Sequence, residues 1–252
     1  AIDIPTADGM LNAHLYAPAT APDAAPAVLV LMDAPGVRPA LHGMAARLAA
    51  AGYRALLPNL YWRRLREVGF DRAAFSQDGD PERERIFNLA RGYGHDQFRV
   101  DLPAMLDALG VTAAQPGAAV GYCMSGRFAL QALAEAPDRI AAAVSFYGTR
   151  MVTEAADSPH RWLPGLTRGE AYLCFAEHDP YIPAGVPETV TAAMRASGIA
   201  HRIDHYPGTH HGFAQPDSGG FDPVAAERHW AAMLDLLARV PRCMVSLPSP
   251  AA

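Results

Sequence analysis

The amino-acid sequence predicts a doubly wound α/β fold built on a single, mostly parallel β-sheet. Short apolar runs alternate along the chain with segments in which apolar residues recur at helical spacing, and this alternation is typical of consecutive βαβ units. Residues 27–32 are apolar at every position, as expected of a parallel strand that is covered on both faces. The 252 residues suffice for one large domain of this class or for two small ones.

The individual elements follow in order, with turn residues between them. Residues 2–4 and 11–16 alternate around Ala7-Asp8-Gly9 and predict an antiparallel edge hairpin. The further predicted strands are residues 27–32, 53–57, 118–120, 140–146, 171–176 and 201–206. The predicted helices lie around residues 41–48, 98–109, 124–133, 186–194 and 226–237. Pro103 is expected to start or kink the second helix, because proline lacks a backbone N–H.

We expect one domain over residues 1–243, with a cap-like insertion at about residues 59–96 and a flexible tail at residues 244–252. The insertion is polar and rich in charge, and it contains Tyr61-Trp62-Arg63-Arg64. A long connection of this kind more often covers a site than forms a separate domain. The tail contains Ser246-Leu247-Pro248-Ser249-Pro250 and is expected to fray.

Composition excludes several classes of function. The net charge of −5 gives no basic field for nucleic acid or an anionic membrane, and no apolar run approaches the roughly 18 residues that span a bilayer. Cys123, Cys174 and Cys243 are odd in number and far apart, which predicts neither disulfides nor a zinc site. A cytoplasmic location is therefore expected. Nucleotide-binding loops and metal-ligand spacings are absent, so no cofactor is expected.

The segment Ala118-Ala119-Val120-Gly121-Tyr122-Cys123-Met124-Ser125-Gly126-Arg127 is the strongest local signal. It combines a buried strand, a turn with a nucleophile at its apex and the start of a helix, which is the pattern of a nucleophile elbow. Gly121 and Ser125 let the strand and the helix approach each other closely. The backbone N–H of Met124 would stabilise an oxyanion at the start of the helix. A lone cysteine is nevertheless more often a small buried hydrophobe than a nucleophile.

Two further residues turn this weak motif into a catalytic hypothesis. Cys123, Asp179 and His211 each follow a different predicted strand, so all three lie at the carboxyl edge of the sheet, in the order nucleophile, acid, base. A free thiol is only a few per cent thiolate at neutral pH, so the imidazole would take its proton. Asp179 would hold the imidazole in one tautomer. A second oxyanion donor is expected from the N–H of Ala34.

Alternatives for these roles stay open at this point. His210 competes with His211 as the base, and Glu177 competes with Asp179 as the acid. The histidines could also form a metal cluster, but their spacing matches no known ligand set, so we expect no metal site. The members of that cluster would be His201, His205, His210 and His211.

Over roughly residues 4–237 the chain resembles the dienelactone hydrolase family. The resemblance is carried by the Asp179 turn and by two segments, Gly121-Tyr122-Cys123-Met124-Ser125-Gly126-Arg127 and Tyr206-Pro207-Gly208-Thr209-His210-His211-Gly212-Phe213. The resemblance implies an α/β-hydrolase fold and a catalytic triad of Cys123, Asp179 and His211. It favours His211 over His210 by its position before Gly212-Phe213. It also implies that Asp33, in place of the family's usual glutamate, modulates the thiol, and that Ala34 lines the oxyanion hole.

The chain departs from the family pattern where the substrate binds. The dienelactone hydrolase that names the family uses two arginines to hold a carboxylate. Arg85 matches one of them, whereas Gln215 stands at the second position and Leu89 replaces an expected tyrosine. The resemblance thus implies hydrolase chemistry more strongly than dienelactone specificity. The candidates for substrate binding are Arg85, Tyr122, Gln215 and Tyr61.

The sequence therefore predicts a hydrolase that cleaves a lactone or a small carboxylic ester through a Cys-His-Asp triad and a covalent thioester. Two alternatives remain: a thioesterase or acyltransferase with the same triad, and a non-catalytic ligand-binding relative in which Asp33 or Ser125 spoils the elbow. The expected partner is a small-molecule ester or lactone, with no nucleic acid and no membrane. We expect a monomer or a small homo-oligomer.

Overall fold

The computed structural model describes residues 1–20, 22–67, 70 and 79–240, and within these residues eight β-strands form one sheet in the order β1-β2-β4-β3-β5-β6-β7-β8. The strands are β1 (Ile2–Thr6), β2 (Gly9–Tyr16), β3 (Ala27–Leu31), β4 (Arg54–Pro58), β5 (Gly117–Tyr122), β6 (Ile140–Phe146), β7 (Glu170–His178) and β8 (Ala200–His210). β3 to β8 run parallel, and β1 and β2 form the antiparallel edge hairpin. The predicted fold class is confirmed.

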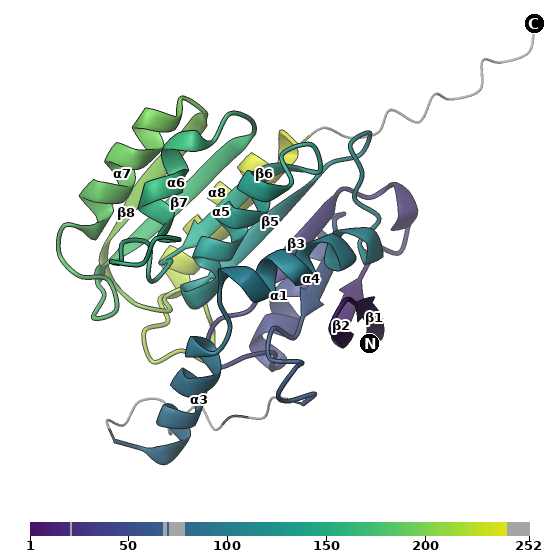
Figure 1. Cartoon of the computed structure of the whole chain (residues 1–252), viewed down its shortest axis with the longest axis horizontal. Helices are drawn as coiled ribbons and strands as arrows, with labels where there is room; N and C mark the ends of the chain where they lie inside the picture. The colour runs from purple at the N-terminus through teal and green to yellow at the C-terminus, as the bar shows by residue number, and fades with distance from the viewer. Residues whose placement is uncertain (21, 68–69, 71–78, 241–252) are drawn as a thin grey trace, which may run out of the picture.

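Helices cover both faces of the sheet (Figure 1). They are α1 (Pro39–Ala50), α3 (Pro81–Arg91), α4 (His95–Ala108), α5 (Gly126–Glu135), α6 (Pro159–Trp162), α7 (Val186–Ser197) and α8 (Pro223–Ala238), with short 3₁₀ turns at Pro22–Ala24, Cys123–Ser125 and Leu163–Gly165. α1 and α8 share one face, where Arg47 lies over the Trp230 ring and pairs with Glu227. α4, α5 and α7 lie on the opposite face (Figure 1). The central strands are therefore buried on both sides, which explains the continuous apolar run of β3.

Two element boundaries differ from the sequence-based expectation. β8 continues to His210 instead of ending at residue 206, and it does so through a register shift against β7 between Ala176 and His178. α4 begins at His95 and runs through Pro103. Proline is tolerated there because Phe98, Leu102 and neighbouring apolar residues of α4 are buried on one face, and tertiary packing outweighs the missing hydrogen bond.

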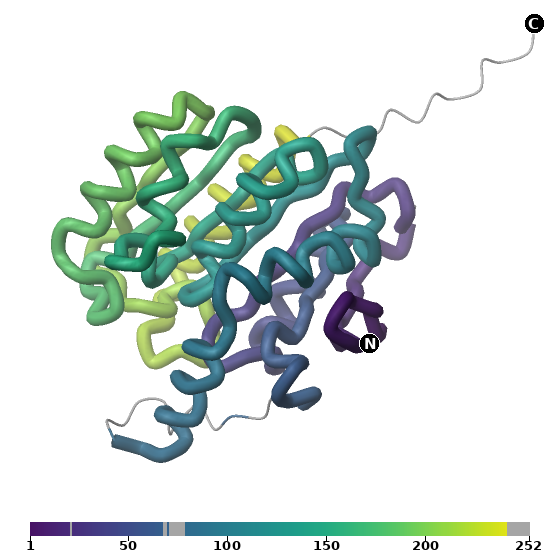
Figure 2. Tube along the Cα trace, in the orientation of Figure 1, coloured from purple at the N-terminus to yellow at the C-terminus, as the bar shows by residue number. Residues whose placement is uncertain are grey.

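The predicted insertion at residues 59–96 lies only partly within the described residues. Its first part is anchored on α4, because Trp62 and Arg63 both bind the buried carboxylate of Asp101, at 3.1 Å and 2.8 Å. Its second part forms α3, which projects beyond one end of the sheet (Figure 2). Cys243 and the predicted tail at residues 244–252 lie outside the described residues. Across the described chain, each helix is too short or too polar to cross a membrane.

Candidate active site

The turn after β5 holds Cys123 in a strained backbone conformation. Cys123 has a φ of 54°, a left-handed value that is uncommon for a residue other than glycine and that marks functional turns. A Cβ on Gly121 would lie 2.1 Å from the carbonyl oxygen of Ser125, so glycine is required there for the turn to close. α5 begins three residues after Cys123. The thiol therefore lies at the apex between a central strand and a helix.

Cys123, His211 and Asp179 lie together although 88 residues of sequence separate the first from the second. Nδ1 of His211 is 2.7 Å from Oδ2 of Asp179. The other carboxylate oxygen of Asp179 accepts the backbone N–H of Tyr181 at 2.9 Å. Cys123 and His211 line the same cavity, and the interaction with the Cys123 thiolate is one cause of the raised pKa of His211. The chain thus places a thiol beside an imidazole that a carboxylate holds, at the carboxyl edge of the sheet.

The electrostatic setting favours a charged imidazole. Burial disfavours the charged form of His211, but the negative charge of the Cys123 thiolate and the hydrogen bonds to Asp179 and Cys123 outweigh it and raise the pKa of His211 from 6.5 to about 10. A protonated imidazole beside sulfur is the arrangement that keeps a cysteine in its nucleophilic thiolate form.

The two competing residues point elsewhere. His210 is exposed, and its ring lies 5.1 Å from that of His178. Glu177 is exposed and accepts the backbone N–H of Gly208 at 2.5 Å, which supports the irregular part of β8. His210 is the last residue of β8, whereas His211 is the first residue of the turn that follows, so the two side chains leave the backbone in different local conformations.

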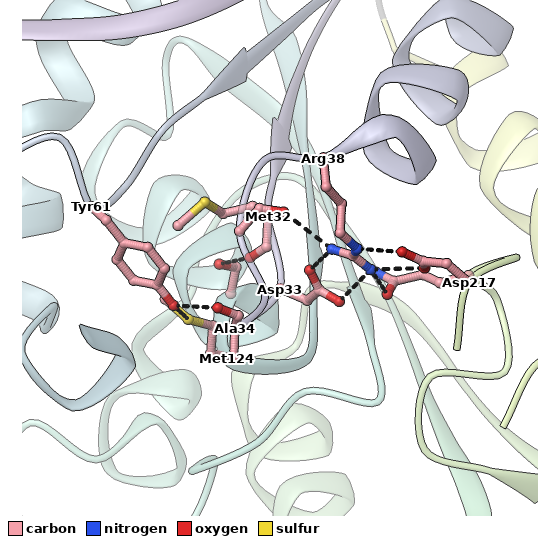
Figure 3. A network of polar contacts seen from close by, with 10 residues as sticks. Met32, Asp33, Ala34, Arg38, Tyr61, Met124 and Asp217 are labelled. Atoms are coloured by element: carbon pink, nitrogen blue, oxygen red, sulfur yellow. Dashed lines mark hydrogen bonds and ion pairs between the residues drawn. The ribbon is translucent and has the colours of Figure 1, made fainter. Parts of the chain in front are cut away.

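The two expected oxyanion donors belong to segments that one tyrosine holds together. The buried hydroxyl of Tyr61 donates to the carbonyl oxygen of Ala34 at 2.8 Å and contacts the sulfur of Met124 at 3.2 Å. Figure 3 shows this side chain reaching both residues from the side opposite Arg38. Ala34 and Met124 line the same cavity as Cys123. Tyr61, expected from the sequence to bind substrate, is 2% exposed and lies behind this loop.

Ser125 replaces the glycine that the family has after its nucleophile, and its hydroxyl has a definite partner. The side chain is fully buried and donates to the carbonyl oxygen of Met32, the residue after β3. This hydrogen bond joins the elbow to the segment that carries Asp33 and Ala34. Ser125 therefore fastens the elbow to its neighbouring strand and leaves the turn intact.

Asp33 lines the cavity and forms a buried ion pair with Arg38, at the start of α1. The Arg38 guanidinium also binds Asp217 at 2.6 Å and Oε1 of Gln215 at 2.6 Å (Figure 3). Burial opposes the charged form of Arg38, yet the carboxylates of Asp33 and Asp217 raise its pKa above the usual value. Asp33, which the sequence suggests as the acid that modulates the thiol, is thus held by Arg38, a residue that the sequence did not point to.

We expect Arg38→Met to lower the free energy of unfolding by about 3–5 kcal/mol, because it breaks the buried ion pair between Arg38 and Asp33 by removing one partner. Chemical denaturation followed by circular dichroism would measure the change. The matched control is Arg47→Met, which removes an ion pair whose arginine side chain is 45% exposed and should cost about 1 kcal/mol or less. A loss for Arg38→Met as small as the control would contradict the assignment, and adding Asp33→Asn should restore part of the stability.

The remaining candidates for substrate binding differ in position. Gln215 lines the cavity and is 1% exposed; within the described residues its Nε2 has no hydrogen-bond partner. Arg85 lies on the outer face of α3, where it pairs with Glu82 at 2.8 Å and its side chain is 45% exposed. Tyr122 is 1% exposed and packs in the core, with its hydroxyl 3.2 Å from His229. Of these three, Gln215 is the one that faces the thiol.

The cavity above Cys123 has a volume of about 230 Å³. Part of its wall comes from residues that sequence reasoning left without a role in the site, and these are Phe87, Arg127, Tyr147, Arg150 and Tyr181. Four of them could have been found, because they lie within five residues of the carboxyl end of β5, β6 or β7, where ligands bind in open α/β sheets. Phe87 comes from α3, whose position over the site no local pattern predicts.

The residues that the structure describes contain no group of three or more His, Cys, Asp or Glu side chains arranged to hold a metal ion. The reactive groups of the site are the ones named above. They can deliver a thiolate, exchange a proton through an imidazole, and offer two backbone N–H groups to a developing oxyanion.

The strand order, the antiparallel hairpin and the nucleophile turn after β5 together define an α/β-hydrolase. A sequence model of the dienelactone hydrolase family matches residues 11–240. The chain belongs to the dienelactone hydrolase family and is a hydrolase.

Individual relatives cover nearly the whole chain. The carboxymethylenebutenolidase of Pseudomonas sp. (strain P51) is 27% identical over 237 residues, which cover 92% of this chain and 91% of the relative. A proposed carboxymethylenebutenolidase of Azospirillum brasilense is 30% identical over 229 residues, covering 90% and 92%. The crystal structure of a proposed dienelactone hydrolase from Klebsiella pneumoniae is similar with a TM-score of 0.80 and 25% identity, covering 94% of this chain and 96% of that one.

Proposed function

We propose that this protein hydrolyses a lactone or a small carboxylic ester through a covalent thioester on Cys123, with His211 and Asp179 as its partners. The observation that carries the proposal is that Cys123, at a strained turn, shares a cavity with His211, whose Nδ1 lies 2.7 Å from Oδ2 of Asp179. Membership of the dienelactone hydrolase family supports the same chemistry.

In the first half of the reaction, the Cys123 thiolate attacks the carbonyl carbon of the ester. A C–S bond forms, and the carbonyl oxygen becomes an oxyanion that accepts the N–H groups of Met124 and Ala34. The tetrahedral intermediate then collapses, the C–O bond breaks, and the imidazolium of His211 gives its proton to the departing alkoxide. In a lactone the alcohol formed in this step stays attached to the acyl chain.

In the second half, His211 is neutral and takes a proton from a water molecule as that water attacks the thioester carbonyl. The C–S bond breaks, the carboxylic acid leaves, and the thiolate–imidazolium pair is restored. Asp179 holds Nδ1 of His211 through both steps, so that Nε2 faces sulfur or water. A reducing compartment keeps free thiols from oxidation, so the proposal includes a cytoplasmic location.

The substrate class is proposed from the chemistry and from the relatives. The relatives that are named carboxymethylenebutenolidase act, by that name, on a butenolide, which is an unsaturated lactone. A cavity of about 230 Å³ accommodates a small acyl group. Parallel assays with a panel of five-membered lactones and with 4-nitrophenyl acetate would test the proposal. Hydrolysis of neither class by a protein with a reactive Cys123 would overturn it.

Alkylation of Cys123 by iodoacetamide as a function of pH separates the catalytic proposal from a non-catalytic binding protein. A thiol that His211 activates should react rapidly well below pH 8, where an ordinary thiol with a pKa of about 8.5 is mostly protonated. In His211→Ala the rate should instead rise with pH as it does for a free cysteine. Identical profiles for the two proteins would contradict activation of the thiol.

A thioesterase or acyltransferase with the same triad is the second candidate function. A thioesterase differs from the proposed hydrolase in its acyl donor, which is a thioester, whereas an acyltransferase differs in its acyl acceptor, which is not water. Assays with a thioester substrate test the first alternative, and product analysis in the presence of added alcohols and thiols tests the second. The hydrolase proposal predicts carboxylic acid as the main product, whereas transfer to an alcohol or thiol in preference to water would favour the acyltransferase.

We expect Tyr61→Phe to lower kcat about tenfold with little change in KM, because Ala34 and Met124 lose the hydroxyl that fixes their N–H groups. The expected loss is smaller than the roughly 10²–10³-fold loss of kcat that removal of a whole oxyanion donor causes, because both N–H groups remain. The control is Tyr172→Phe, which removes a hydroxyl bonded to Asp204 and Tyr206, away from the cavity. Equal kcat values for the two variants would mean that Tyr61 has a purely structural role.

A further inference from the structure

The unusual feature of the cavity wall is a buried arginine without a counter-ion. Arg127, in the first turn of α5, is 5% exposed. Its one hydrogen bond is a long contact of 3.4 Å from Nη2 to the carbonyl oxygen of Tyr93, and among the described residues its Nε has no partner. No carboxylate of the described chain forms an ion pair with it. A buried cation in this state is costly.

Three other largely enclosed arginines show what this fold normally supplies. Arg38 binds the carboxylates of Asp33 and Asp217, and Arg63 binds those of Asp8 and Asp101. Arg54 lies 4.0 Å from the carboxylate of Asp23 and donates to the carbonyl oxygens of Pro22 and Asp23. Among the described residues Arg127 is the exception, and unlike the other three it lines the cavity that contains Cys123. An anion that arrives with a ligand would supply the missing partner.

A second cation faces the same space. Arg150 follows β6, has a φ of 57°, and forms no ion pair or hydrogen bond within the described residues. Arg150 and Arg127 line both the main cavity and an adjoining hollow of about 70 Å³, together with Arg91. Burial and the nearby charge of Arg150 lower the pKa of Arg127 to about 10, although the charges of Cys123 and Asp157 act in the opposite direction. The hollow thus concentrates positive charge beside the thiol.

The surrounding acids leave this charge largely uncompensated. Asp157 lines the hollow but is exposed and makes no ion pair with either arginine in the described part of the chain. Arg91 is held by Glu84 at 3.3 Å and belongs to the rim. Asp33 is neutralised by Arg38, on the other face of the sheet.

We propose that Arg127 and Arg150 form an anion-binding subsite beside Cys123, which holds a carboxylate of the substrate. Guanidinium groups bind carboxylates through paired N–H donors, and the small hollow accommodates a compact group of this kind. This inference rests on the proposed ester or lactone hydrolysis and adds the charge of the substrate. It places the carboxylate on the α5 side of the thiol, whereas Gln215 and Arg38 stand on the α1 side and Arg85 faces away.

The test compares charged and neutral esters of the same shape. For the acyl side, mono(4-nitrophenyl) adipate is paired with methyl 4-nitrophenyl adipate; for the leaving-group side, 4-acetoxybenzoate is paired with its methyl ester. We expect the wild-type enzyme to have the higher kcat/KM for the charged member of at least one pair. Arg127→Gln should lower that value at least tenfold and change the neutral member less than threefold, since a hydrogen bond to a charged group contributes about 1.5–3 kcal/mol.

Arg150→Gln keeps the test independent of folding, because this exposed residue can change without disturbing the core. It should lower the charged-to-neutral ratio severalfold. The control Arg99→Gln removes an arginine that pairs with Glu135 away from the site, and its ratio should equal that of the wild type. Adipate should also slow the alkylation of Cys123 by iodoacetamide in the wild type and not in Arg127→Gln.

The outcomes separate the two proposals. An equal fall of both members of a pair in Arg127→Gln would mean that the arginine serves the thiolate and not a substrate anion, which overturns the subsite. An unchanged charged-to-neutral ratio in both variants overturns it as well. A wild-type protein that hydrolyses none of the four esters, with Cys123 reactive to iodoacetamide, would instead count against the proposed function.

Discussion

Cys123→Ala should lose ester hydrolysis, with kcat for 4-nitrophenyl acetate lowered by about 10⁴-fold or more. The expected loss is large because removing the nucleophile of a triad abolishes the covalent pathway and leaves only binding and the oxyanion donors. Steady-state assays measure the loss, and a lactone or methyl ester should be included because an imidazole alone cleaves activated esters slowly.

The matched control is Cys174→Ala. Cys174 is the other thiol within the described residues, lies fully buried in β7, and burial raises the pKa of its thiol. Its removal should leave kcat within about twofold of the wild type, because it contacts neither the cavity nor His211. Mass spectrometry after rapid quenching should detect an acyl group on Cys123 in the wild type and none in Cys123→Ala. Undiminished hydrolysis by Cys123→Ala would remove the thiol from the mechanism.

His211→Ala should lower kcat/KM by about 10³–10⁴-fold, because one imidazole maintains the thiolate and then serves both proton transfers. His210→Ala is the control. Its ring is exposed and lies against His178, so the variant should retain activity within about twofold. A large loss in His210→Ala together with an active His211→Ala would reverse the assignment of the base.

The same histidine predicts a pH dependence of stability. The folded-state pKa of His211, about 10, lies above its ordinary value of 6.5. A group with a raised folded-state pKa stabilises the fold fully below its unfolded-state pKa and loses that contribution as the pH rises through the folded-state value. Thermal unfolding of the wild type should therefore shift to lower temperature between about pH 6.5 and 10, and the shift should be smaller in His211→Ala. Equal shifts would contradict the charged state of this imidazole.

The position of Gln215 gives the proposed substrate specificity a physical basis. Where the family's named enzyme has a second arginine, this chain has a neutral amide that Arg38 holds by its oxygen. The positive charge facing the thiol is instead on Arg127 and Arg150, on the opposite side. A substrate carboxylate would therefore approach Cys123 from the α5 side. The side of approach differs because Arg38 is already paired with carboxylates, whereas Arg127 and Arg150 form no ion pair with a carboxylate of the described residues.

The sequence alone predicts the parts of this protein that depend on local pattern. The uninterrupted apolar residues of β3, the turn around Cys123 and the succession of strands and helices are each encoded within a short segment. The carboxyl ends of parallel strands meet at one edge, so the meeting of Cys123, Asp179 and His211 could also be predicted. The resemblance to the family favours His211 over His210 where spacing leaves the choice open.

The tertiary structure decided which charges are paired, how β8 ends and where the side chains around the site point. Arg38 meets Asp33 within five residues but reaches Asp217 across 179 residues, and no periodicity predicts that contact. The sequence suggests that Tyr61 binds substrate, but its side chain lies behind the segment that carries Ala34, because its hydroxyl donates to the buried carbonyl oxygen of Ala34. Arg127 has the sequence position of an ordinary residue in a first helical turn, and only the packed fold buries it without an ion pair to any carboxylate of the described residues. Whether a side chain is buried and whether its charge is paired depend on segments that are distant in sequence but packed together. A local sequence pattern does not contain that information.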